Sequence, residues 1–173
     1  VRTIHCKRAA IIPGTVDAHS NCFQVLLRGK ADHPLGFRDW VDRHLYPTVA
    51  GISLETLKRA AGICFLEMLR AGVTTVGEFH YVHNGPGGSD AGTTYDEAVI
   101  DAAREVGLRM AFLRTFYDTA KRAGQERFCE SAELAAERTL YLREKYSGDP
   151  AVSVLPAPHS LHGASEAMIR RAV

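Results

Sequence analysis

Four times along this chain a short apolar strand pattern is followed by a helical pattern, and this alternation most constrains the fold. The strand patterns cover residues 15–19, 73–80, 108–116 and 151–157. The helical patterns cover residues 53–72, 94–107, 131–148 and the segment from residue 165 onward. Glycine stands at the end of each full helical pattern, where helices commonly stop. Strands that alternate with helices in this way form a parallel α/β sheet.

The kind of parallel sheet follows from what comes after the first strand pattern. A doubly wound sheet places a G-x-G-x-x-G turn there, and the chain has no such motif. A barrel of parallel strands needs no such turn, but a complete one has eight strand–helix units in about 250 residues. The sequence therefore predicts an incomplete α/β fold, the N-terminal half of a (β/α)8 TIM barrel with about four βα units.

The ends of the chain set the expected domain division. Residues 1–13 are predicted to be a lead-in with a short strand at residues 9–12, which Pro13-Gly14 ends. Residues 14–173 are predicted to form the partial barrel. Because the first residue is valine rather than methionine, we expect the chain to begin inside a longer gene product.

Composition argues against several classes of partner. The 21 basic and 20 acidic residues leave a formal net charge of +1, which gives no electrostatic reason to bind nucleic acid or an anionic membrane. No apolar run reaches the ~18 residues that a membrane span needs, and the first residues lack the apolar core of a signal peptide. The four cysteines are scattered, so we expect a reducing, cytoplasmic location.

Histidines gather where the strand patterns end. Five of the eight stand there: His19, His80, His83, His159 and His162. The C-terminal ends of barrel strands carry the active site, so this distribution indicates a metal or proton-transfer site.

Some of these positions also have a purely structural interpretation. His80 could point into the core and hydrogen-bond there, and His83 could be solvated beside a loop. Glu78 could face the barrel interior or pair with a buried cation.

Residues 20–52 are long for a strand-to-helix connection, so they are expected to form an elaborated loop with short helices that shapes a pocket. Residues 94–97 have the spacing of a capping box, which would open a helix.

Four segments together resemble the metal-dependent amidohydrolase superfamily. They are residues 17–24 (DAHSNCFQ), 67–76 (EMLRAGVTTV), 78–83 (EFHYVH) and 157–161 (APHSL). Within that superfamily the EFHYVH run and the nearby Phe23-Gln24 look most like the formimidoylglutamate deiminases of histidine breakdown. The resemblance extends over about residues 9–173, and EFHYVH is its most specific part.

The resemblance implies one zinc or iron ion. The family pattern places a His-x-His pair at the first strand end, and both histidines bind the metal. Here the two positions hold His19 and Asn21, and an amide oxygen is a weaker zinc ligand than an imidazole nitrogen. The family's remaining ligands, on the fifth and eighth strands, are expected beyond Val173.

The resemblance also assigns substrate contacts. Gln24 corresponds to a glutamine near the substrate's imino group, Tyr81 to a pocket tyrosine, and His159 to a catalytic histidine that contacts substrate. His162 takes the place of an arginine that binds the substrate carboxylate. In the long loop, Trp40-Val41 replaces a tryptophan–arginine pair. Both changes remove arginines suited to a carboxylate.

These expectations define two alternatives for function. The first is a metal-dependent hydrolase, a deaminase or deiminase that cleaves a C–N bond of an amidine or aminated heterocycle and releases ammonia. A small molecule such as formimidoylglutamate would be its substrate. The second is a truncated or degenerate fragment without catalysis that acts by association. Four strands leave open sheet edges and an uncovered interior, so the expected partner is a second copy of the chain or the missing barrel half.

Overall fold

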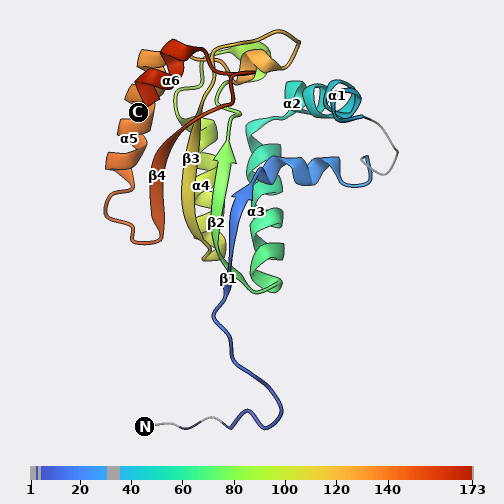
Figure 1. Cartoon of the computed structure of the whole chain (residues 1–173), viewed down its shortest axis with the longest axis vertical. Helices are drawn as coiled ribbons and strands as arrows, with labels where there is room; N and C mark the ends of the chain where they lie inside the picture. Colours follow the sequence, from blue (N-terminus) through green and yellow to red (C-terminus); the bar gives the residue numbers. More distant parts are fainter. Residues whose placement is uncertain (1–2, 4, 31–35, 173) are drawn as a thin grey trace.

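A computed structural model describes residues 3, 5–30 and 36–172 of the chain. The chain continues from the predicted lead-in into four strands, each followed by helices (Figure 1). The strands are β1 (Thr15–Ser20), β2 (Val73–His80), β3 (Arg109–Phe116) and β4 (Val152–Pro158). The α-helices are α1 (Phe37–Trp40), α2 (Tyr46–Gly51), α3 (Leu54–Arg70), α4 (Thr94–Val106), α5 (Ala132–Lys145) and α6 (Glu166–Ala172). Short turns of other helix types are η1 (Cys22–Leu27), η2 (Val41–Leu45), η3 (Pro86–Gly88) and η4 (Gln125–Arg127).

The strands form one sheet in the order β1-β2-β3-β4, and every neighbouring pair is parallel. The pairing of β1 with β2 is irregular between Asp17 and Ser20, the stretch that contains His19. Irregular pairing of this kind re-aims side chains at a strand end. A Cβ on Gly77 would lie 2.7 Å from the Ala18 carbonyl oxygen, so only glycine admits this close approach of β1. The predicted four-stranded parallel α/β fold is confirmed.

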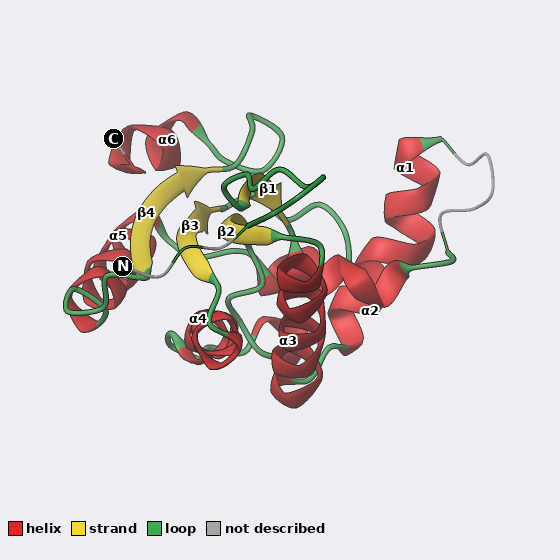
Figure 2. Ribbon diagram, turned by 90° about the horizontal axis from the view of Figure 1, so that it is seen from below, coloured by secondary structure: helices red, strands yellow, loops and turns green. Residues whose placement is uncertain are grey.

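Helices α3, α4 and α5 cover one face of the curved sheet (Figure 2). The side chains of the strands that point toward these helices form the core. They include Val76, Met110, Phe112, Val152 and Val154, each no more than 8% exposed. Strand order that follows chain order, with these helices on one face, is the arrangement of a barrel rather than of a doubly wound sheet.

The opposite face of the sheet is open to solvent among the described residues. Val16 on β1 is 66% exposed and Leu155 on β4 is 43% exposed. Apolar side chains at these positions fill the interior of a closed barrel. The predicted uncovered interior is therefore present in this structure.

Local sequence signals set most helix boundaries. Ser53 and Ser131 cap α3 and α5, because each side-chain oxygen accepts the backbone N–H three residues on. Gly107 ends α4 in the left-handed conformation with φ = 81°. The capping box predicted from Thr94 is wrong: Thr93 is the N-cap residue, and its hydroxyl bonds the Glu97 carboxylate at 2.8 Å instead of a backbone N–H.

The predictions for the two segments on either side of β1 have different outcomes. The predicted strand at residues 9–12 is wrong, because this segment is irregular and exposed, and in Figure 1 it extends away from the sheet without a partner strand. The predicted elaborated loop contains η1 and a helical stretch through α1, η2 and α2, so helices occur there as expected. None of the helices in the described residues has the length and hydropathy required to cross a membrane.

Candidate functional site

A pocket of about 1080 Å³ opens at the C-terminal ends of the strands. All six residues predicted for the site line it: His19, Asn21, Gln24, Tyr81, His159 and His162. They come from the ends of β1, β2 and β4 and from η1, segments that lie far apart in the sequence. Further lining comes from the long loop, as the sequence predicted, and from the segment before α5, which the sequence did not predict to lie at the pocket.

His19 and Asn21 lie together at the end of β1. The His19 ring stacks on Phe79 with 5.4 Å between ring centroids, and its Nε2 lies 3.4 Å from Asn21 Nδ2. The other amide atom, Asn21 Oδ1, is buried without a hydrogen-bond partner among the described residues. A buried polar atom without a partner is uncommon and calls for an explanation.

These two side chains fit a metal ion as part of its ligand set. Rotating the Asn21 amide exchanges its oxygen and nitrogen, which puts an oxygen near His19 Nε2. Two donors that share a tetrahedral zinc lie about 3.3 Å apart, because each bond is about 2.0–2.1 Å long. A catalytic zinc takes about three protein ligands, so the pair supplies two donors and needs more from elsewhere.

His159 is held among aromatic rings at the end of β4. Its centroid lies 4.8 Å from that of Tyr117, 5.8 Å from Phe79 and 6.1 Å from Tyr81. Burial, and secondarily the nearby His162, lower the pKa of His159 below its ordinary value. Its imidazole is therefore neutral at pH 7 and can accept a proton.

The loop after β4 fits tightly around this ring. A Cβ on Gly163 would lie 2.4 Å from Tyr117 Cε2 and 2.7 Å from His159 Nδ1. Contacts this short cannot form, so glycine at this position keeps both rings in place. His162 in the same loop is exposed, and its backbone N–H bonds Ser160 Oγ at 3.4 Å.

Gln24 and Tyr81 meet on the wall of the pocket. Gln24 Nε2 donates to the Tyr81 hydroxyl at 3.1 Å. The Tyr81 ring packs edge-on against Phe23 and Phe128, at 5.3 and 4.9 Å. Burial is the main cause that raises the pKa of Tyr81 well above its ordinary value, so the hydroxyl keeps its proton and can donate it.

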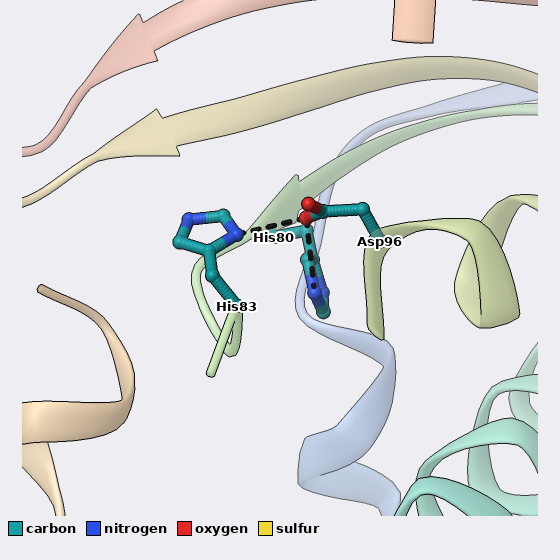
Figure 3. Close-up of side chains that lie close together, drawn as sticks. All are labelled: His80, His83 and Asp96. Atoms are coloured by element: carbon teal, nitrogen blue, oxygen red, sulfur yellow. Dashed lines mark hydrogen bonds and ion pairs between the residues drawn. The ribbon is translucent and has the colours of Figure 1, made fainter. Parts of the chain in front are cut away.

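A second polar cluster lies behind the sheet, among buried side chains. The ligand atoms of His80, His83 and Asp96 lie within 4.8 Å of one another, and all three residues are fully buried (Figure 3). His83 Nδ1 contacts Asp96 Oδ1 at 2.8 Å, and His80 Nε2 lies 3.6 Å from the same oxygen. Such a group is a candidate metal centre by residue type.

The hydrogen bonds of this cluster leave little room for a metal. Both ring nitrogens of His83 face acceptors, Asp96 Oδ1 and the Thr115 carbonyl oxygen, each at 2.8 Å. Both ring nitrogens are thus engaged, and neither is free to bind a metal. Asp96 Oδ2 accepts from Arg114 Nε at 3.1 Å, and this guanidinium would repel a metal cation. The cluster therefore does not fit a metal, and His83 instead links Asp96 to the Thr115 carbonyl.

Arg114 connects the cluster to further buried charges. Its two terminal nitrogens bond both oxygens of Glu130, at 2.7 and 2.9 Å. Glu130 also pairs with Arg138, which reaches the exposed Asp90. The buried carboxylates of Asp96 and Glu130 thus each face a guanidinium, which is how a buried charge cluster avoids an unpaired charge. We call the five buried residues of this set, His83, Asp96, Arg114, Glu130 and Arg138, the buried ion network.

The pKa shifts of Asp96 in the network and of the neighbouring His80 follow from burial and from the charges around them. Burial alone would raise the pKa of Asp96, but Arg114 and His83 outweigh it and hold that pKa below its usual range. Burial lowers the pKa of His80 to about 3, although Asp96 opposes the shift. His80 is therefore neutral, and its Nε2 donates to the Val82 carbonyl oxygen at 3.0 Å.

The outcomes for the three structural alternatives differ. The expectation that His80 hydrogen-bonds in the core is confirmed. The expectation that His83 is solvated is wrong, because the ring is completely buried against Asp96. Glu78 has no cation partner among the described residues. Its Oε1 accepts the Cys22 N–H at 2.8 Å, and burial raises its pKa. Arg114 was missed, although an arginine inside a strand of apolar residues is a signal of a buried ion pair.

Comparison with known proteins gives a consistent result. The sequence pattern described as "Amidohydrolase family" matches residues 10–173. Formimidoylglutamate deiminase from Pseudomonas aeruginosa is 32% identical over 145 residues, which cover 78% of this chain and 32% of that protein. The 5-methylthioadenosine/S-adenosylhomocysteine deaminase from Desulfovibrio desulfuricans is 26% identical over 90% of this chain and 31% of that protein. The chain thus spans about a third of the length of these relatives.

Solved structures show the same fold. An amidohydrolase from Brucella melitensis superposes with a TM-score of 0.84 and 26% identity, over 93% of this chain and 38% of that chain. An adenosine deaminase from Xanthomonas campestris with bound zinc gives a TM-score of 0.73 and 25% identity, over 92% of this chain and 32% of that one. The four parallel strands therefore match the N-terminal part of an amidohydrolase TIM barrel.

Proposed function

The chain belongs to the amidohydrolase family, and from this premise we propose that it is part of a metal-dependent deaminase or deiminase. The reaction would cleave a C–N bond of an amidine or an aminated heterocycle and release ammonia. The observation that carries this proposal is the convergence of His19, Asn21, Gln24, Tyr81, His159 and His162 on one pocket. Family membership supports hydrolytic chemistry, and the pocket supports these residues as its site.

Each group has a role that its environment permits. His19 and Asn21 would hold one zinc or iron ion, which when bound supplies a water activated at neutral pH. His159, neutral at pH 7, can take up a proton at a ring nitrogen and return it to the leaving nitrogen. Gln24 and Tyr81 offer an amide and a hydroxyl that can orient the imino or amino group of the substrate.

Formimidoylglutamate is the first substrate to test. It is the substrate named by the relative that is 32% identical to this chain, and the EFHYVH run at residues 78–83 points the same way. Adenosine-type compounds are the second class, because other relatives are named for deamination of such compounds. In both classes water replaces a nitrogen on an sp² carbon, so the same pocket residues could support either reaction.

Ammonia release tests the proposal directly. The chain loaded with zinc or iron is assayed with N-formimidoyl-L-glutamate and with adenosine, beside a chelator-treated sample. Release should depend on metal and fall at least ~100-fold in His159→Gln, which is the usual contribution of a general acid or base. His5→Gln, in the exposed N-terminal segment, is the matched control. Absence of ammonia from both substrate classes in the metal-loaded chain would contradict catalysis by this chain and favour the second candidate below.

A second candidate function rests on the open face of the sheet. The exposure of Val16 and Leu155 favours a non-catalytic protein that associates with a second copy or with the remaining half of a barrel. Burial of such apolar area would stabilise the complex. Sedimentation of the chain distinguishes this candidate, since a stable monomer at all concentrations would count against it. For either candidate we propose a cytoplasmic location and a homo-oligomer or barrel-completing partner.

A further inference from the structure

Three residues outside the predicted site form a polar group on the far wall of the pocket. Gln125 in η4 is 1% exposed, and its Nε2 donates to the hydroxyls of Tyr46, at 2.9 Å, and Tyr117, at 2.7 Å. All three side chains line the pocket. One amide nitrogen therefore holds two hydroxyl groups from distant parts of the chain side by side.

The direction of these hydrogen bonds is fixed. Gln125 Oε1 accepts the backbone N–H of Lys121 at 2.8 Å, so the oxygen of the amide is identified and the other atom must be the NH₂ group. Both hydrogens of that group go to the tyrosine oxygens. Each tyrosine thus accepts from Gln125 and still has its own O–H proton to give. Among the described residues neither hydroxyl donates to an acceptor.

The hydroxyls also stay protonated. Burial is the main cause that raises the pKa of both Tyr46 and Tyr117. A buried hydroxyl that has no acceptor is costly, so these two donors point to a ligand that supplies one. The structure keeps the donors ready in advance, which reduces the cost of binding.

The surrounding backbone is built to keep this arrangement. Gly124 has φ = 94°, and a Cβ there would lie 2.8 Å from the Tyr46 carbonyl oxygen, so η4 approaches α2 very closely. In the same turn the buried Arg127 donates to the carbonyl oxygens of Ile52, at 2.7 Å, and Asn84, at 2.9 Å. Arg127 thereby joins α2, the loop after β2 and η4 into one unit.

Charge favours an anionic ligand at this wall. Arg38, Lys121 and Arg122 also line the pocket, and no carboxylate side chain lines it among the described residues. Arg122 is partly neutralised, since its Nη1 lies 2.8 Å from Asp42 Oδ1. Two neutral hydroxyls with this moderate positive charge suit a single-charged carboxylate better than a phosphate dianion.

We propose that Tyr46, Tyr117 and Gln125 form a carboxylate-binding subsite for the end of the substrate remote from the reacting carbon. Aromatic contacts give the order along the pocket: His19 touches Phe79, Phe79 touches His159, and His159 touches Tyr117. The subsite is therefore separated from the metal-ligand candidates by intervening rings. The subsite takes the place of the arginines that are missing at positions 41 and 162, because its hydroxyls can donate hydrogen bonds to the substrate carboxylate. This assignment rests on the proposed function for the reaction, but the binding itself does not require turnover.

A titration of the full chain labelled with 3-fluorotyrosine tests the subsite. Glutarate is the probe, glutaramide is its uncharged counterpart, and ¹⁹F resonances are assigned from single Tyr→Phe variants. Glutarate should shift the Tyr46 and Tyr117 resonances with one saturable curve, and glutaramide should not. Tyr46→Phe and Tyr117→Phe should each weaken glutarate binding about tenfold, because each removes one hydrogen bond to a charged group.

Two further variants sharpen the result. In Gln125→Glu the new carboxylate still accepts the Lys121 N–H, but it would also accept the O–H protons of both tyrosines. These protons would no longer be available to the ligand, so this change should weaken glutarate binding more than either tyrosine change. Tyr141→Phe, on the exposed surface of α5, should change nothing. Heat denaturation of every variant shows whether the fold is retained, and Tyr46→Phe and Tyr117→Phe decide the matter if Gln125→Glu fails to fold.

Three results would overturn the subsite. They are no saturable binding of glutarate, equal binding by the Tyr→Phe variants and the unsubstituted chain, and tighter binding of inorganic phosphate through the same tyrosines. The titration needs neither metal nor catalysis. A chain that binds glutarate through Tyr46 and Tyr117 but releases no ammonia refutes the proposed reaction only, and a chain that releases ammonia without this binding refutes the subsite only.

Discussion

The pocket and the buried ion network lie at the same ends of the same strands, yet they use histidine in opposite ways. On β2, Phe79 lines the pocket beside His19 and His159, while the next residue, His80, lies behind the sheet near Asp96. Successive side chains of a strand point to opposite faces. A shift of one residue therefore separates a position that lines the pocket from a position in the core.

The two regions also differ in how their polar groups are satisfied. The hydrogen bonds of the buried ion network are complete: Asp96 bonds both His83 and Arg114, and the other ring nitrogen of His83 contacts the Thr115 carbonyl oxygen. The pocket is open: Asn21 Oδ1 lacks a partner, and the hydroxyls of Tyr46 and Tyr117 have protons to give. Completed hydrogen bonding indicates a stabilising role, and incomplete hydrogen bonding indicates a binding role.

The largest expected effect comes from breaking the network at its centre. Arg114→Met leaves the carboxylates of Asp96 and Glu130 buried without their guanidinium, and we expect a loss of about 3–5 kcal/mol in the free energy of unfolding. Arg104→Met is the matched control, because its pairs with Asp101 and Asp149 lie at the surface and should be worth less than ~1 kcal/mol. Urea denaturation at pH 7 measures both. Equal losses would show that the network does not stabilise the fold.

The next effect disturbs the pocket through packing. In Gly163→Ala the new methyl group meets Tyr117 and His159 at impossible distances, so we expect about 1–3 kcal/mol of destabilisation and a displaced His159 ring. Gly62→Ala is the control, since a Cβ there meets nothing within 4 Å in the interior of α3. That change should stabilise by about 0.4–1 kcal/mol. Heat denaturation and the NMR shifts of the His159 ring report the two results, and an unshifted ring in Gly163→Ala would contradict the packing argument.

A smaller effect appears in the pH dependence of stability. The pKa of His80 is about 3 in the folded chain and about 6.5 when unfolded. As pH falls below ~6.5 the unfolded chain takes up this proton first, so His80 reduces stability by up to about 1.4 kcal/mol per pH unit until the folded pKa is reached. His80→Gln removes this contribution and should flatten the slope between about pH 6 and pH 5, where carboxylates contribute little.

The control for the pH experiment is the exposed His5. His5→Gln should leave the slope of unfolding free energy against pH as it is in the unsubstituted chain. Denaturation at several pH values with each variant gives the slopes. If His80→Gln and His5→Gln have the same slope, His80 does not stay neutral in the folded chain.

The sequence was sufficient for the four strands of the sheet and for part of the pocket, because these depend on local patterns. Alternation of strands and helices predicts the sheet order, and residues at strand ends such as His19 and His159 converge once strands are parallel. Resemblance to the amidohydrolases added Gln24 and Tyr81. These residues are named by motifs that extend over a few positions, so no knowledge of distant contacts was required.

The buried ion network and the tyrosine pair escaped prediction because they depend on contacts between distant segments. Asp96 stands at the start of α4, where an acidic residue ordinarily favours the helix dipole in solvent, yet it is buried against Arg114. Tyr46 and Gln125 are 79 positions apart and meet only because η4 folds against α2. For these residues the sequence shows which side chains are present but not which distant side chains they contact.

The smallest effect tests how strongly the pocket histidines interact. His162 is the second cause, after burial, of the lowered pKa of His159. His162→Gln should therefore raise the pKa of His159 without restoring its ordinary value, because burial remains. An NMR pH titration of the imidazole signals measures the shift, with His44→Gln as the control outside this pair. An unchanged His159 pKa would mean that solvent completely screens the interaction between His159 and His162. The pocket histidines would then differ from the ion pairs of the buried ion network, whose charges interact directly.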